Sequence, residues 1–169
     1  GSAGIVSSGT LDAGANDLSL LSAGNVNVTQ GTVSGANIGI TAGSLIVQPG
    51  VPATSSSLVN ATGNLTVNAN SVLVRGSDTS ASLSAKLQAA GAITIDAGSL
   101  SVEGGNANNA SASIDPAGIT ITTTGNVTLT GGGGSDAYAL IYAPAGNLAI
   151  NAPTGMVSLT PGTGLNANA

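Results

Sequence analysis

The residues that could do chemistry are few. The 169-residue chain has seven acidic and two basic residues and contains neither histidine nor cysteine. The charged residues are Asp12, Asp17, Arg75, Asp78, Lys86, Asp96, Glu103, Asp115 and Asp136. Glycan cleavage needs a closely spaced pair of carboxyl groups, and a serine nucleophile needs a neighbouring base. Because no histidine is present and no acid has an evident catalytic partner, the sequence predicts no catalytic residue, no enzyme activity and no cofactor.

Four of the charged residues fall in the most variable part of the sequence and form the one candidate ligand site. Arg75, Asp78, Glu103 and Asp136 each follow an apolar, strand-like stretch, within segments that differ from one another. We expect these segments to line one edge of the molecule, where a ligand could bind. The simpler interpretation is a solvated charged edge that keeps the molecule soluble.

A metal site is suggested by one motif only. Residues 131–139 read GGGGSDAYA and formally fit the calcium nonapeptide pattern. Calcium in such repeats lies between successive copies of the motif, so a lone copy lacks its partner ligands. The sequence therefore predicts no metal site and a flexible glycine loop in its place.

The charge balance excludes two kinds of partner. The net charge is −5, and Arg75 and Lys86 are the only basic residues. A nucleic acid or an anionic membrane surface needs a basic footprint, which is absent here. No apolar run reaches 18 residues, so we also expect no membrane insertion.

The elements that would position these residues follow from a repeated apolar pattern. Ile93 and Ile95 are followed seven residues later by Leu100 and Val102, each pair being separated by one polar residue. Alternation at period two is typical of a strand with one buried side. Equivalent pairs begin at residues 18, 38, 65, 93, 119 and 148, and at 26, 45, 72, 100, 127 and 157. A recurring period near 27 residues indicates a solenoid or another repeat array.

A third strand in each repeat is found by counting back from the next glycine. Val59, Leu87, Ile114 and Tyr142 each lie four residues before Gly63, Gly91, Gly118 and Gly146. These positions are therefore predicted to face inward. Segment 81–90 also has some helical character, but the third-strand alignment explains it better.

The fold predicted from this pattern is an all-β parallel β-helix with three short strands per coil. Residues 18–169 would form five to six coils of about 27 residues, and residues 1–17 an irregular start or a partial coil. β-Branched residues at period two and frequent glycines disfavour helices. A propeller would need four longer strands per repeat and usually aromatic residues, of which this chain has two.

Three stretches carry a resemblance to a known family. Residues 63–69 (GNLTVNA), 125–131 (GNVTLTG) and 91–102 resemble the haemagglutinin-type repeats of filamentous-haemagglutinin-like exoproteins. The resemblance covers roughly residues 35–160. The family comprises large bacterial adhesins and contact-dependent toxins that are secreted by the two-partner route. The resemblance implies a right-handed β-helix and a secreted or surface-attached location.

The expected function is a structural shaft segment of a bacterial adhesin or exoprotein. Two alternatives remain open: a self-assembling extracellular fibre subunit, and a carbohydrate-binding β-helix. The expected partners are further coils of a parent protein or end-to-end copies of the chain, with host glycans or a cell surface as other candidates. Neither end of the repeat array carries an evident cap, which leads us to expect association along the axis.

Overall fold

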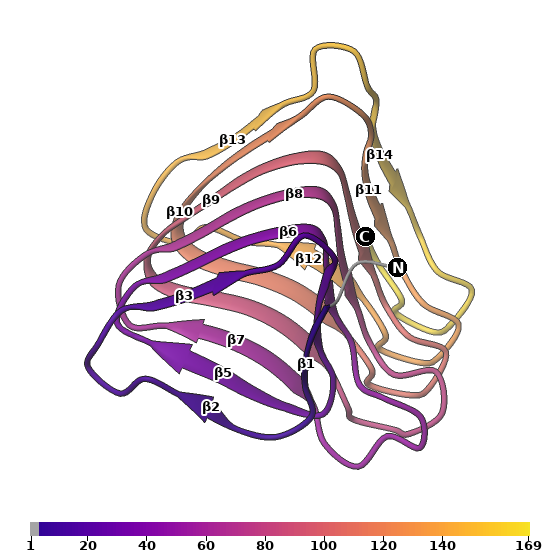
Figure 1. Cartoon of the computed structure of the whole chain (residues 1–169). Helices are drawn as coiled ribbons and strands as arrows, with labels where there is room; N and C mark the ends of the chain where they lie inside the picture. The colour runs from indigo at the N-terminus through magenta and orange to yellow at the C-terminus, as the bar shows by residue number, and fades with distance from the viewer. Residues whose placement is uncertain (1–3) are drawn as a thin grey trace.

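The computed structural model describes residues 4–169, and every regular element among them is a β-strand. The strands pair in parallel and stack as a right-handed β-solenoid of about five turns, with roughly 27 residues per turn. The predicted all-β parallel β-helix is therefore confirmed. In Figure 1 the chain passes clockwise around a triangular cross-section from coil to coil.

The described residues form 14 strands. They are β1 (Ile5–Ser7), β2 (Leu11–Asp12), β3 (Leu18–Leu21), β4 (Asn25–Val28), β5 (Gly31–Gly35), β6 (Ile38–Val47), β7 (Ser57–Ala61), β8 (Leu65–Arg75), β9 (Ala85–Glu103), β10 (Ala112–Thr123), β11 (Val127–Thr130), β12 (Ala139–Ile141), β13 (Leu148–Asn151) and β14 (Val157–Thr160). The longest strands bend around corners of the triangle, so that β9 contributes to all three of its sides.

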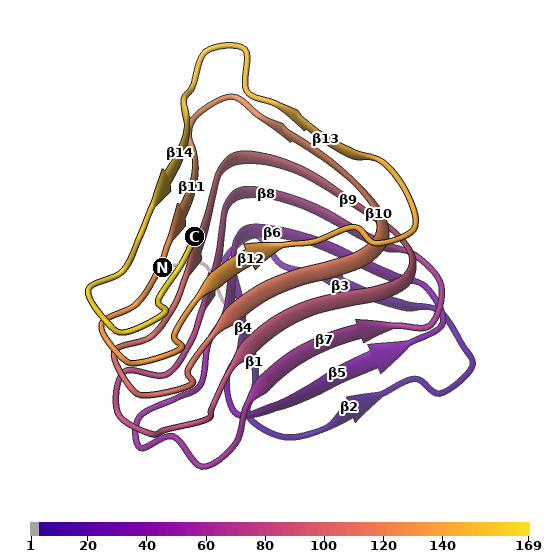
Figure 2. The ribbon, with the colours of Figure 1, turned by 180° about the vertical axis from the view of Figure 1, so that it is seen from behind.

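The three sides are named here by the residues that build them. Face I contains residues 18–21, 38–42, 65–69, 93–97, 119–123 and 148–151. Face II contains residues 5–7, 25–28, 44–47, 71–75, 99–103, 127–130 and 157–160. Face III contains residues 11–12, 31–35, 57–61, 85–89, 112–116 and 139–141. Figures 1 and 2 show these faces from opposite ends of the stack.

The core is a set of apolar ladders along the axis. On face I, Ile40, Val67, Ile95 and Ile121 are direct partners in successive coils, and all are at most 1% exposed. Adjacent strands lie about 4.8 Å apart, so each side chain packs on its equivalents above and below. This confirms the predicted register. A slip of one residue would turn the whole row toward solvent.

The third-strand prediction is confirmed in three coils and wrong in the last. Val59, Leu87 and Ile114 are partners and fully buried, and segment 85–89 is strand, not helix. In the last coil Ile141, not Tyr142, pairs with Ile114. Leu148 follows Ile141 by seven positions, whereas Ile119 follows Ile114 by five. Because the last corner is longer, counting back from Gly146 gave the wrong residue.

The N-terminal segment is a partial coil within the described residues. β1 pairs with β4 on face II and β2 pairs with β5 on face III, both in register with the following coil. Residues 1–3 lie outside the described part of the chain. Of the two alternatives that the sequence left open for the residues before residue 18, an irregular start or a partial coil, the described residues of this segment form a partial coil.

Candidate functional site at the charged edge

The corner between faces II and III carries the candidate ligand residues. Four of its segments, called the edge loops, are residues 76–84, 104–111, 131–138 and 161–168. The last three share one turn, in which the amides of Gly105, Gly132 and Gly162 donate to carbonyl oxygens five residues later at 2.6–2.7 Å. The residue before each acceptor has a left-handed φ of 55–56°. These left-handed residues are Asn109, Asp136 and Asn166. The segments differ in sequence, but their backbones repeat.

Glycines allow the edge loops to touch backbone to backbone. A Cβ atom on Gly132 would lie 1.9 Å from the carbonyl oxygen of Gly105. A Cβ on Gly105 would lie 2.0 Å from the carbonyl oxygen of Ser77, and one on Gly162 would lie 2.0 Å from that of Gly132. Ordinary side chains cannot approach so closely. Gly132 and its equivalents are therefore required by close stacking of the loops.

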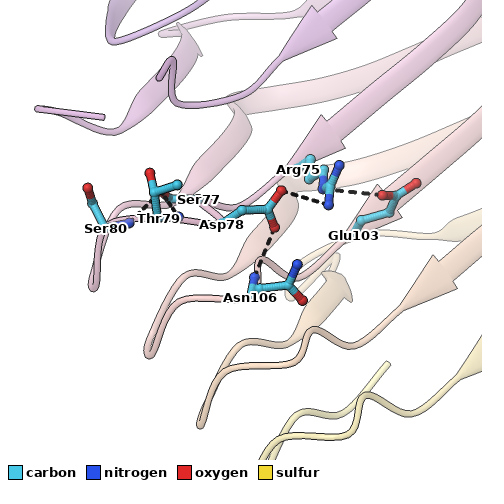
Figure 3. Close-up of polar contacts among 7 residues, drawn as sticks. All are labelled: Arg75, Ser77, Asp78, Thr79, Ser80, Glu103 and Asn106. Atoms are coloured by element: carbon cyan, nitrogen blue, oxygen red, sulfur yellow. Dashed lines mark hydrogen bonds and ion pairs between the residues drawn. The ribbon is translucent and has the colours of Figure 1, made fainter. Parts of the chain in front are cut away.

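Three of the four candidate residues meet in one cluster, shown in Figure 3. Arg75 Nη2 lies 2.8 Å from Asp78 Oδ2, and Arg75 Nε lies 3.5 Å from Glu103 Oε2. Arg75 and Glu103 are direct partners at the ends of β8 and β9. Arg75 Nε is buried and makes no hydrogen bond, so its contact with Glu103 is a Coulombic attraction at longer range. All three side chains are about one-third exposed, and such pairs contribute little to stability.

The remaining oxygens of the two carboxylates contact neighbouring protein groups. The amide of Asn106, one coil further on, donates to Asp78 Oδ1 at 3.0 Å. The hydroxyl of Ser101 donates to Glu103 Oε1 at 2.7 Å. The cluster thus ties the loop that follows β8 to the next coil. It leaves no opposed pair of free carboxylates, as acid–base catalysis would need.

Asp136 lies apart from this cluster. It occupies the left-handed position of its loop, and its Oδ1 accepts a hydrogen bond of 3.0 Å from Asn166 Nδ2. The equivalent positions of the adjacent coils hold Asn109 and Asn166, so no second carboxylate lies in that row. Within residues 4–169 no group of three or more acidic side chains is placed to hold a metal ion.

A row of side-chain amides and one further ion pair were not anticipated from the sequence. At the corner leading to face I, the backbone amide of Asn37 donates to Asp17 Oδ1 at 3.1 Å. In the next coil the backbone amide of Asn64 donates to the side-chain oxygen Oδ1 of Asn37 at 2.9 Å. On face III, Lys86 Nζ lies 2.7 Å from Asp115 Oδ2. The sequence contains one signal for the row of amides, which is its position in the repeat: Asn37 and Asn64 each directly precede the first apolar residue of a face I strand.

Asp12 is the acid whose environment most clearly changes its pKa. Its Oδ1 accepts hydrogen bonds from the amide of Gly14 at 2.9 Å and from the Ser34 hydroxyl at 2.7 Å. Both bonds favour the ionised form, the Gly14 bond most, and they hold the pKa of Asp12 below its ordinary value. Asp12 is exposed, so this shift has a small effect on stability.

Two hollows of the described surface could bring reactive groups close together. An open hollow of about 490 Å³ lies on face I beside Gly39, and a second of about 550 Å³ lies at the corner between faces I and II beside Gly43. The first contains Asp17, Asn37 and Asn64, whose side chains are used in the corner row. Neither hollow brings two acids together.

No protein family, curated protein or solved structure matches the chain. No helix within residues 4–169 is long and apolar enough to cross a membrane.

Proposed function

We propose that the chain is a structural shaft segment, a rod of stacked coils that separates other parts of a secreted or surface-attached bacterial exoprotein. One observation carries the proposal: the polar side chains of the surface bond mainly from coil to coil. Hydroxyl pairs 27 residues apart join Ser44 to Ser71 at 2.8 Å, Ser84 to Ser111 at 3.1 Å and Ser101 to Thr128 at 2.9 Å.

The charged edge supports the same proposal. Arg75 joins β8 to Glu103 of β9, and Lys86 of β9 joins Asp115 of β10. Both basic residues of the chain are therefore engaged between coils. A shaft needs such axial contacts along its length and does not need a concave site. The proposed location, secreted or attached to the cell surface, is supported by the resemblance of the repeats to haemagglutinin-type repeats.

Carbohydrate binding is the second candidate, because the only two aromatic residues are exposed together. Tyr138, Leu140 and Tyr142 flank and include β12 and are 39%, 38% and 55% exposed. Alternate residues of an extended chain point to the same side, which places all three outward on face III. Tyrosine combines an apolar ring with a polar tip and suits a sugar surface.

An assay with a panel of glycans distinguishes a structural shaft from a protein that cleaves glycans and from one that binds them, since both of these functions need a site. The full chain is incubated with acidic and neutral polysaccharides, and released reducing or unsaturated ends and retained glycan are measured. The shaft proposal predicts neither turnover nor retention. Turnover that is lost in Glu103→Gln or Asp78→Asn would contradict it. Retention that is lost in Tyr142→Ala, but kept in the matched surface variant Val51→Ala, would establish carbohydrate binding in its place.

A further inference from the structure

Two rows of outward side chains run along face I over four successive coils, those of β6, β8, β9 and β10 (Figure 1). Row A is Gly39, Thr66, Thr94 and Thr120, and row B is Thr41, Asn68, Asp96 and Thr122. Their Thr, Asn and Asp side chains are exposed, apart from the half-buried Thr122. Each of these coils has a neighbour on both sides, since β6 also pairs with β3 and β10 with β13. The exposure therefore does not arise from an open end.

The polar groups of rows A and B are not used between coils. On face II the Ser44 and Ser71 hydroxyls bond at 2.8 Å, and on face III Lys86 Nζ lies 2.7 Å from Asp115 Oδ2. The side chains of rows A and B make no hydrogen bond or ion pair with any other group of the described chain. Face I therefore presents a flat set of donors and acceptors that the coils leave available to a partner.

We propose that two copies of the chain pack side by side through face I, with their long axes in the same direction and a two-fold axis parallel to them. The two-fold axis turns the second face over, so that row A of one copy lies on row B of the other, coil against matching coil. Both faces have the same repeat of about 4.8 Å, so every coil meets a coil. Stacked sheets lie about 10 Å apart, which leaves room for one layer of side chains from each copy.

Laying row A on row B pairs donors with acceptors. Thr94 of one copy lies opposite Asp96 of the second copy, so that its hydroxyl can donate to the carboxylate. Thr66 lies opposite Asn68 of the second copy, whose amide both donates and accepts. The next coil places threonine opposite threonine. Because the contact is isologous, each of these pairs occurs twice.

Charge favours face I over the other two faces as the contact surface. Asp96 is the one charged residue of rows A and B, so two copies of face I bring only two charges together. Face II carries Arg75 and Glu103, and face III carries Lys86 and Asp115. A second copy laid on face II or face III would have to remove these charges from water, which costs free energy.

The position of Asp96 also favours the shared direction of the two axes. In the proposed pair the two Asp96 positions are separated along the interface by two residues of a strand, about 6.6 Å. If the axes were opposed, a two-fold axis at the centre of the rows would pass between the coils of Asn68 and Asp96. The two Asp96 positions would then be one coil apart along the interface, about 4.8 Å. Like charges repel, so the shared direction costs less.

The hollow beside Gly39 fits the same arrangement. A Cβ atom on Gly39 would meet nothing within 4 Å, and the hollow of about 490 Å³ opens beside it. Laying row A on row B places Thr41 of the second copy opposite Gly39, at this hollow. The position without a side chain thus receives an exposed one from the second copy.

The contact is small, so the pair should be weak in free solution. Four coils and five residues of strand cover about 19 Å by 16 Å, or about 300 Å². Stable complexes bury about 800 Å² per partner. Neighbouring shafts attached to one surface share a direction and have a high effective concentration, which compensates for a weak contact. The inference rests on the proposed surface-attached shaft in that respect only, and the glycan panel tests the shaft independently.

Charge variants of the full chain test the pair by sedimentation equilibrium up to high concentration. The wild type is expected to show a monomer–dimer equilibrium that ends at the dimer, because an isologous contact closes. Thr94→Lys places an ammonium group opposite Asp96 of the second copy and should lower the dissociation constant. Thr94→Asp places a second carboxylate there and should raise it. Two symmetric exposed charge pairs correspond to a change of roughly 2- to 30-fold in either direction.

Gln88→Lys and Gln88→Asp are the matched controls, since Gln88 is an exposed residue of the same strand that points outward on face III. They change the net charge equally and should leave the dissociation constant as in the wild type. Far-UV circular dichroism confirms that all four variants are folded. Wild-type and Thr94→Lys proteins that both stay monomeric at the highest concentration would overturn the proposal, as would equal shifts in the Thr94 and Gln88 variants. Weaker association in both Thr94 variants would refute the shared direction.

Discussion

Replacing Ile95 with alanine should destabilise the solenoid strongly. Ile95 is fully buried between its partners Val67 and Ile121. The substitution removes three buried carbon atoms, at about 0.8 kcal/mol each, so that transfer alone costs about 2.4 kcal/mol. The cavity adds to this, because hydrogen-bonded strands on both sides prevent collapse. The total loss should fall within the range of about 2–5 kcal/mol that such substitutions show.

Thr94→Ala is the matched control, since Thr94 is the preceding residue of the same strand and points outward. An exposed substitution of this kind changes the free energy of unfolding by less than about 0.5 kcal/mol. Urea unfolding followed by far-UV circular dichroism measures both variants. If Thr94→Ala were as damaging as Ile95→Ala, or more so, the assignment of inward and outward residues on face I would be refuted.

Two further predictions concern the edge loops and the first coil. Gly132→Ala forces a methyl group against the carbonyl of Gly105 and should lower the free energy of unfolding by about 1–3 kcal/mol or more; Gly39→Ala meets nothing within 4 Å and should leave it unchanged or raise it by up to about 1 kcal/mol. Equal urea midpoints for the two variants would contradict the stacked loops. Asp12 should titrate below the ordinary aspartate pKa in a carbon-13 NMR titration, and Ser34→Ala should move its pKa upward. Because the folded pKa is depressed, the stabilising contribution is present above the unfolded pKa and disappears as the pH falls through the folded pKa. An unchanged pKa in Ser34→Ala would show that this hydrogen bond does not hold the carboxylate.

The inward register was predictable because each coil repeats the same two-residue alternation. The inward orientation of Ile95 and its partners could be predicted without knowing the lengths of the other corners, because faces I and II are joined by short turns of similar length. The ion pair between Arg75 and Glu103 was also within reach of the sequence. Each residue directly follows an inward valine, Val74 or Val102, so the register that pairs the valines pairs the charges as well.

The parts that could not be predicted depend on corner lengths and on the path of the loops. Tyr142 was placed inward because the last corner is longer than the three corners before it. Asp136 was grouped with Asp78 because both follow face II, yet they occupy different positions of their loops. Strand register does not determine those positions. The close stacking of Gly132 on Gly105 likewise depends on the path of the loop backbone. It produces no periodic pattern of apolar residues in the sequence from which it could have been predicted.

Removal of one coil tests most directly the claim that this chain is a stack of equivalent units. Ile38 and Leu65 are partners in adjacent coils, so deleting residues 39–65 joins Ile38 to Thr66 and keeps every later side chain in phase. Deleting residues 39–64 joins Ile38 to Leu65 and turns the following alternation by one residue. Measured by urea unfolding, the 39–65 deletion is predicted to unfold cooperatively and to lose about one coil's share of the stability, while the 39–64 deletion is predicted to lose far more. Equal stabilities for the two deletions, or an unfolded 39–65 deletion, would contradict the account.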